Sequence, residues 1–150
     1  MAPAIFARWR RRASRAAYEY IAVTDHSKGL SIANGINEAK LKKQSAEIEA
    51  INSELRAGGK SLTILHSIEM NLNPLGAGDM EPRPLRSLDI VLGSFHSALR
   101  RKDDQTERYL AALRNPHIQI LGHPRGRIYN YRSRFARGLG NGLLRGDSPR

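Results

Sequence analysis

A repeated alternation between short apolar runs and longer helical or loop segments constrains this chain more than any other feature. Four runs of four or five residues are rich in β-branched and other apolar side chains, which is typical of buried strands. Because these runs do not alternate strictly between apolar and polar residues, they favour a parallel sheet covered by helices. We therefore expect an α/β fold with about four parallel strands and flanking helices. The predicted strands cover residues 20–24, 62–65 (continuing towards Ile68), 88–92 and 118–121.

Two helices are predicted between these strands. Residues 36–57 place apolar side chains near one helical face, and Gly58-Gly59 ends the segment. Residues 103–114 form the second helix, which ends before Pro116. A loop rich in Pro and Gly is expected over residues 71–84. The apolar contacts expected of the helices are Leu41, Ile48, Ile51 and Leu55 in the first and Tyr109, Leu110 and Leu113 in the second.

Each predicted strand is followed within a few residues by a side chain that can bind a metal ion. The candidates are Asp25 with His26, then Glu69, His96 and His123; the last three are 27 residues apart, close to the ~30 residues of one βαβ unit. The carboxyl ends of parallel strands share one edge, so these side chains are expected to meet there. Imidazole and carboxylate are suitable ligands for zinc, manganese or iron. A carboxylate such as Glu69 could also bridge two ions.

Several polar residues near this edge have more than one interpretation. Three interpretations are open for Asp25: it is a metal ligand, it accepts a hydrogen bond from a ligating imidazole, or it forms a turn. Arg125 and Arg127 either hold a phosphate by charge-assisted hydrogen bonds or form a solvated basic loop. His66 and His117 fall within or at the start of strands, away from this edge, so we expect structural roles for them.

Basic residues are concentrated at the two ends of the chain. The formal charge of +11 divides into +4 for residues 1–20, +1 for residues 21–123 and +6 for residues 124–150. Such ends predict contact with nucleic acid or anionic surfaces.

The absence of cysteine excludes disulfides, thiolate zinc sites and cysteine nucleophiles. No apolar run approaches the roughly 18 residues of a membrane span, so we expect a cytoplasmic protein without a membrane partner.

Four motifs in order resemble the PHP (polymerase and histidinol phosphatase) domain family, and most of all the PHP domains attached to family X DNA polymerases. The resemblance implies a distorted (β/α) barrel and a trinuclear metal centre that hydrolyses phosphate esters. It implies that Glu69 bridges two metals, that His96 and His123 complete one of them and that His26 serves a third. The motifs are YEYIAVTDHS at 18–27, IE at 68–69, GSFHS at 93–97 and NPHIQILGHPRGR at 115–127.

Two motifs of that family are missing from this sequence. The family begins with a His-x-His strand, whereas residues 1–17 contain no His, Asp or Glu. The family ends with Asp-x-His, whereas Asp147 is the only acidic residue after His123 and no histidine follows it. We therefore expect an incomplete PHP barrel over residues 18–130, flanked by a basic helix or arm at 1–17 and a basic, disordered tail at 131–150. Unclosed barrel edges predict self-association.

Two functional hypotheses follow from these features. The first is a metal-dependent phosphoesterase, truncated relative to the family, that acts on a phosphorylated small molecule or a nucleic-acid 3′ end. The second is an inactive PHP remnant that binds nucleic acid or anionic surfaces through its basic ends. The first predicts activity that depends on metal, and the second predicts binding that survives chelation and weakens steeply with salt.

Overall fold

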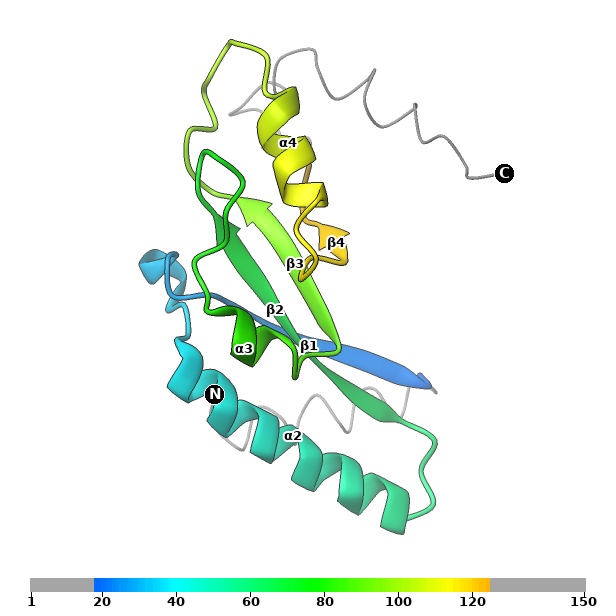
Figure 1. Ribbon diagram of the computed structural model, residues 1–150. Helices are drawn as coiled ribbons and strands as arrows, with labels where there is room; N and C mark the ends of the chain where they lie inside the picture. The colour runs from blue at the N-terminus through cyan, green and yellow to red at the C-terminus, as the bar shows by residue number, and fades with distance from the viewer. Residues whose placement is uncertain (1–17, 125–150) are drawn as a thin grey trace, which may run out of the picture.

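The computed structural model describes residues 18–124, and its centre is one parallel sheet (Figure 1). Strands β1 (Tyr20–His26), β2 (Thr63–Leu72), β3 (Ile90–Phe95) and β4 (Ile120–Leu121) lie in the order β1-β2-β3-β4. Every neighbouring pair is parallel. This arrangement confirms the predicted α/β fold with four parallel strands and flanking helices.

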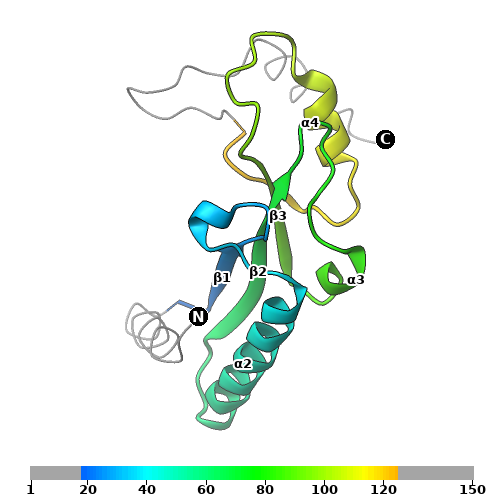
Figure 2. The same ribbon diagram turned by 90° about the vertical axis from the view of Figure 1, so that its left-hand side faces the viewer.

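Three α-helices and one 3-10 turn connect the strands: η1 (Ser31–Ala33), α2 (Glu38–Ala57), α3 (Pro82–Leu85) and α4 (Thr106–Leu113). Asn37 caps α2 by accepting a hydrogen bond from the Lys40 N–H, and Gly58 ends the helix. α2 lies along one side of the sheet (Figure 2). None of the helices within residues 18–124 is long and apolar enough to cross a membrane.

The helices and the sheet enclose the hydrophobic core on one face of the sheet. Successive side chains of a strand point to opposite faces, so every second residue contributes to this core. The larger cluster joins β2 and β3 to all three α-helices through Leu41, Ile68, Met70, Leu72, Met80, Leu85, Val91, Phe95, Tyr109 and Ala112. A second cluster joins α2 to β1 and β2 through Ile48, Leu55, Leu62 and Ile64, with Ile21, Val23 and Ile51 packed against it.

The opposite face of the sheet is exposed along β1, although Ser67 of β2 and Ser94 of β3 are buried on it. On β1 this face carries Tyr20, Ala22 and Thr24, which are all exposed, and Tyr20 retains 65 % of its accessible surface. We name these two sides the helix face and the open face. The candidate ligands His26 and Glu69 lie on the open face.

The second and third strands are longer than predicted. Asn71 and Leu72 pair with Ser94 and Phe95, so β2 continues into the segment that was expected to be a loop. The expectation of a loop from residue 71 is therefore wrong at its start. The alternation of buried Ile68, Met70 and Leu72 explains the extension, because it keeps apolar side chains on the helix face.

The predicted contacts of the last helix also need correction. Leu113 is 46 % exposed, whereas Arg108 and Ala112 are buried. Tyr109 is buried as predicted. The guanidinium of Arg108 lies 4.0 Å from the ring centroid of Phe95, a stacked contact that the sequence analysis did not predict. The predicted contacts of α2 are confirmed for Leu41, Ile48 and Leu55.

Candidate metal centre

The four predicted ligands of the metal site lie at the carboxyl-terminal part of the strands. His26 is the last residue of β1 and pairs in register with Glu69 of β2. His96 directly follows β3, and His123 follows β4 by two residues. His26 and Glu69 occupy positions that alternate with the core residues, so they point away from the helix face. The fold thus brings residues from all four strands to one part of the open face.

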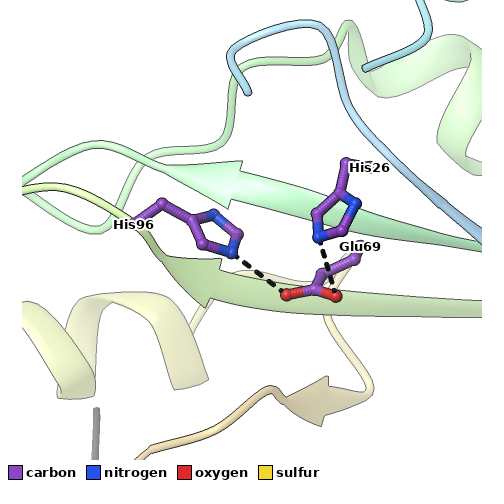
Figure 3. Close-up of side chains that lie close together, drawn as sticks. All are labelled: His26, Glu69 and His96. Atoms are coloured by element: carbon purple, nitrogen blue, oxygen red, sulfur yellow. Dashed lines mark ion pairs between the residues drawn. The ribbon is translucent and has the colours of Figure 1, made fainter. Parts of the chain in front are cut away.

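The carboxylate of Glu69 lies between the imidazoles (Figure 3). Its Oε1 is 3.2 Å from Nε2 of His96 and 3.1 Å from Nε2 of His123. Its Oε2 is 3.4 Å from Nε2 of His26. The two carboxylate oxygens therefore contact different histidines, as the oxygens of a bridging carboxylate would.

The spacing of three donor atoms fits a metal ion. The Nε2 atoms of His96 and His123 are 3.3 Å apart, so with Glu69 Oε1 they form a triangle with sides of 3.1 to 3.3 Å. Zinc-to-nitrogen bonds of about 2.0–2.1 Å place the donors of a tetrahedron about 3.3 Å apart. Three protein donors leave the fourth position free for water or substrate. His26, Glu69 and His96 also form a group whose donor atoms all lie within 4.8 Å of one another.

The protonation of the site suits metal binding at neutral pH. Burial lowers the pKa of His96, and the neighbouring histidines His123 and His26 lower it further against the opposing effect of Glu69. Burial favours the neutral form of Glu69, but the adjacent Ser94 hydroxyl and the three imidazoles together outweigh burial and lower the pKa of Glu69. At pH 7, a neutral His96 and a charged Glu69 are the forms that bind metal.

Gly122 allows the end of β4 to approach the site. Its N–H donates a hydrogen bond to the carbonyl of Gly93, and a Cβ at this position would lie 2.1 Å from the Ser94 Oγ. A side chain here would force the Ser94 hydroxyl or β4 to move. His123 comes directly after Gly122, so this close approach helps to carry its imidazole to Glu69.

The structure places Asp25 on the helix face, apart from this cluster. Its Oδ2 accepts a hydrogen bond from Nε2 of Gln44 at 2.5 Å. The Oε1 of Gln44 lies 3.0 Å from Nε2 of His66, which is also buried. The carboxylate of Asp25 therefore contacts α2 and does not join the group around Glu69. A catalytic or ligating role for it remains a prediction from the sequence.

Other predicted residues lie outside the site or outside the described part of the chain. His117 precedes β4, and its N–H donates a hydrogen bond to Oδ1 of Asn115. Arg125 and Arg127 lie outside the described residues, as do the predicted arm at 1–17 and the tail at 131–150. Their roles stay predictions. The sequence prediction missed Asn71, whose Oδ1 is 3.1 Å from Nδ1 of His96, because it placed this residue in a loop.

Comparison with known proteins yields partial matches to enzymes of phosphate chemistry. The chain is 37 % identical over 119 residues to the DNA polymerase/3′-5′ exonuclease PolX of Bacillus subtilis, a match that covers 79 % of this chain and 20 % of that protein. It is 33 % identical over 75 residues to a probable phosphatase of Caldanaerobacter subterraneus, covering 47 % of this chain and 30 % of the phosphatase. A probable phosphatase of Acetivibrio thermocellus is 35 % identical over 65 residues, covering 41 % and 27 %.

These matches bear on the resemblance that the motifs suggested. No family model matches the chain. The chain spans between about a fifth and a third of the length of these curated relatives. The relatives nevertheless include both a family X DNA polymerase and probable phosphatases of the PHP type. The chain is therefore homologous, over part of its length, to the PHP family, as its four motifs predicted.

Proposed function

We propose that the chain is a metal-dependent phosphoesterase of the PHP type, which hydrolyses a phosphate monoester or a nucleic-acid 3′ end with a metal-activated water. One observation carries this proposal: the two oxygens of Glu69 face His96 and His123 on one side and His26 on the other. The names of the relatives, a 3′-5′ exonuclease and probable phosphatases, support the same reaction class.

We expect the residues of the site to have distinct roles in metal and substrate binding. Glu69, His96 and His123 would hold one divalent ion (zinc, manganese or iron). His26 and the other carboxylate oxygen of Glu69 would help to hold a second ion. A bound ion of this kind lowers the pKa of a coordinated water towards about 7 and so supplies a hydroxide nucleophile. The charge of Glu69 would offset the positive charge that the ions bring to the open face. Arg125 and Arg127 are proposed to hold the phosphate oxygens of the substrate.

The test combines elemental analysis with hydrolysis assays on the full chain. Wild type, Glu69→Ala, His96→Ala and the control His117→Ala are purified in parallel, and zinc, manganese and iron are measured in each. Release of phosphate from p-nitrophenyl phosphate and of nucleotides from a 3′-labelled oligonucleotide is measured with and without a chelator. We expect bound metal and hydrolysis in wild type and in the control, and loss of both in the Glu69 and His96 variants.

The opposite outcomes would overturn the proposal. A folded wild-type protein that binds none of these metals, or hydrolysis that Glu69→Ala leaves unchanged, contradicts it. Binding of an oligonucleotide that survives chelation and falls steeply with salt would then favour a non-catalytic protein that binds through its basic ends.

A further inference from the structure

His96 has a polar partner on the ring nitrogen that points away from the candidate metal position. Its Nε2 faces Glu69 Oε1 at 3.2 Å, whereas its Nδ1 lies 3.1 Å from Oδ1 of Asn71. Asn71 lies on β2 two residues beyond Glu69, so both side chains project from the same face of the strand. The two nitrogens of His96 are thus engaged by two residues of one strand.

Hydrogen bonds hold Asn71 itself in place. Its backbone N–H donates to Oγ of Ser27 at 2.7 Å, and its carbonyl accepts from the N–H of Asp79 at 3.2 Å. The Ser27 hydroxyl donates in turn to Oδ1 of Asp79 at 2.7 Å. Ser27 is completely buried and directly follows His26. These bonds connect the end of β1, β2 and the loop after β2 into one network beside the site.

This geometry favours one tautomer of His96 when its Nε2 binds a metal. A neutral imidazole carries one N–H, and the amide oxygen of Asn71 can only accept a hydrogen bond. When Nε2 gives its lone pair to a metal, the proton lies on Nδ1 and is donated to Asn71. Without a metal, the carboxylate of Glu69, 3.2 Å from Nε2, competes for the same proton. The opposite orientation of the Asn71 amide would present an N–H group to Nδ1 and move the proton to Nε2, where it would block metal binding.

We propose that Asn71 is a positioning residue, which fixes the tautomer and the ring orientation of His96 so that Nε2 is the metal donor. The proposal rests on the proposed function, because it assumes that His96 binds metal. Hydrogen-bond partners of ligating histidines commonly change metal affinity about 10- to 100-fold when they are removed. Asn71 would act in this way through its side-chain oxygen, while Ser27 and Asp79 hold its backbone.

The experiment compares Asn71→Leu, which removes the acceptor, with Asn71→Asp, which keeps an acceptor oxygen at the same position. Affinities for zinc and cobalt are measured on the full chain by competition with a chromogenic chelator. We expect Asn71→Leu to bind about 10- to 100-fold more weakly and Asn71→Asp to stay within a few-fold of wild type. Long-range ¹⁵N–¹H NMR of the zinc-loaded wild type should show His96 protonated at Nδ1 and bound to zinc through Nε2.

The outcomes separate this inference from the proposed function. Unchanged affinity in Asn71→Leu, or zinc bound through Nδ1 of His96 in the wild type, would overturn the role of Asn71 while the metal site stands. A wild type that binds no metal would overturn the proposed function and this inference with it. The same spectrum tests the inference if Asn71→Leu does not fold.

Discussion

The two faces of the sheet use the same kind of residue in different ways. On the helix face, His66 is buried, contacts Gln44 and lies among the side chains that pack against α2. On the open face, three histidines gather around the carboxylate of Glu69. Burial lowers the pKa of both His66 and His96. A histidine becomes a candidate ligand where it shares a carboxylate with other imidazoles, as His96 does, and not where it contacts an amide of the core, as His66 does.

Neighbouring residues on β2 offer the strongest test of this difference. Ile68 is fully buried on the helix face, and Glu69 follows it on the open face. We expect Ile68→Ala to lower the free energy of unfolding by about 2–5 kcal/mol, since it leaves a cavity in the core. Glu69→Gln should abolish metal binding and change the stability of the chelated protein far less. Urea unfolding with chelator, paired with metal titrations, measures both effects; equal loss of stability in the two variants would contradict the division between the faces.

A methyl group at Gly122 should affect the open face more than the core. The added Cβ would clash with the Ser94 Oγ, so either this hydroxyl must rotate or β4 must shift away from β3. We expect Gly122→Ala to lower stability by about 1–3 kcal/mol and to weaken zinc binding, because His123 follows this residue. Thermal unfolding and chelator competition provide the two measurements. Zinc affinity equal to that of wild type would show that His123 does not depend on this close approach.

Acidification should destabilise the helix face through His66. Burial lowers the pKa of His66 below its ordinary 6.5, although the charges of Asp89 and Asp25 act in the opposite direction. The unfolded chain then binds more protons than the folded chain, so stability rises with pH below about 6.5 and is lost as the pH falls towards the folded pKa. We expect His66→Gln to have a shallower loss of stability than wild type between pH 7 and pH 5. Denaturant unfolding at several pH values with chelator checks this; parallel curves for the two proteins would count against it.

The smallest effect is expected on the solvent side of α2. Arg56 contacts Glu49 at 2.7 Å, and both side chains are exposed. Ion pairs of this kind contribute little because water and salt screen them. Glu49→Ala should therefore leave unfolding and zinc affinity unchanged within error, which makes it the control variant for the other experiments. A clear change in zinc affinity would show that the solvent side of α2 is coupled to the open face.

The strand pattern was sufficient to predict the sheet, whereas helix contacts and strand ends depended on tertiary packing. Apolar runs marked all four strands. The interval of 27 residues predicted that Glu69, His96 and His123 meet at one edge of the sheet, and the fold brings them together. The sequence could not show that β2 continues through Asn71, because its polar side chain and the following Asn-Pro resemble a loop. It also could not show that Arg108 stacks on Phe95, since this contact joins separate elements.

The site itself was predictable by residue but not by orientation. Asp25 and His26 are adjacent in sequence, and the alternation of the strand sends them to opposite faces. Only the register of β1 with β2 shows that His26, and not Asp25, contacts Glu69. The role of Asn71 depends on a contact over 25 residues of sequence and has no local signal.

X-ray absorption at the zinc edge of the zinc-loaded full chain, with Glu69→Gln measured beside wild type, shows whether Glu69 and its histidines hold the metal. We expect nitrogen and oxygen donors at about 2.0–2.1 Å, with the scattering pattern of imidazole rings, and loss of this signal in the variant. A spectrum without imidazole scattering, or one that Glu69→Gln leaves unchanged, would contradict the claim that Glu69 and its histidines form a metal centre.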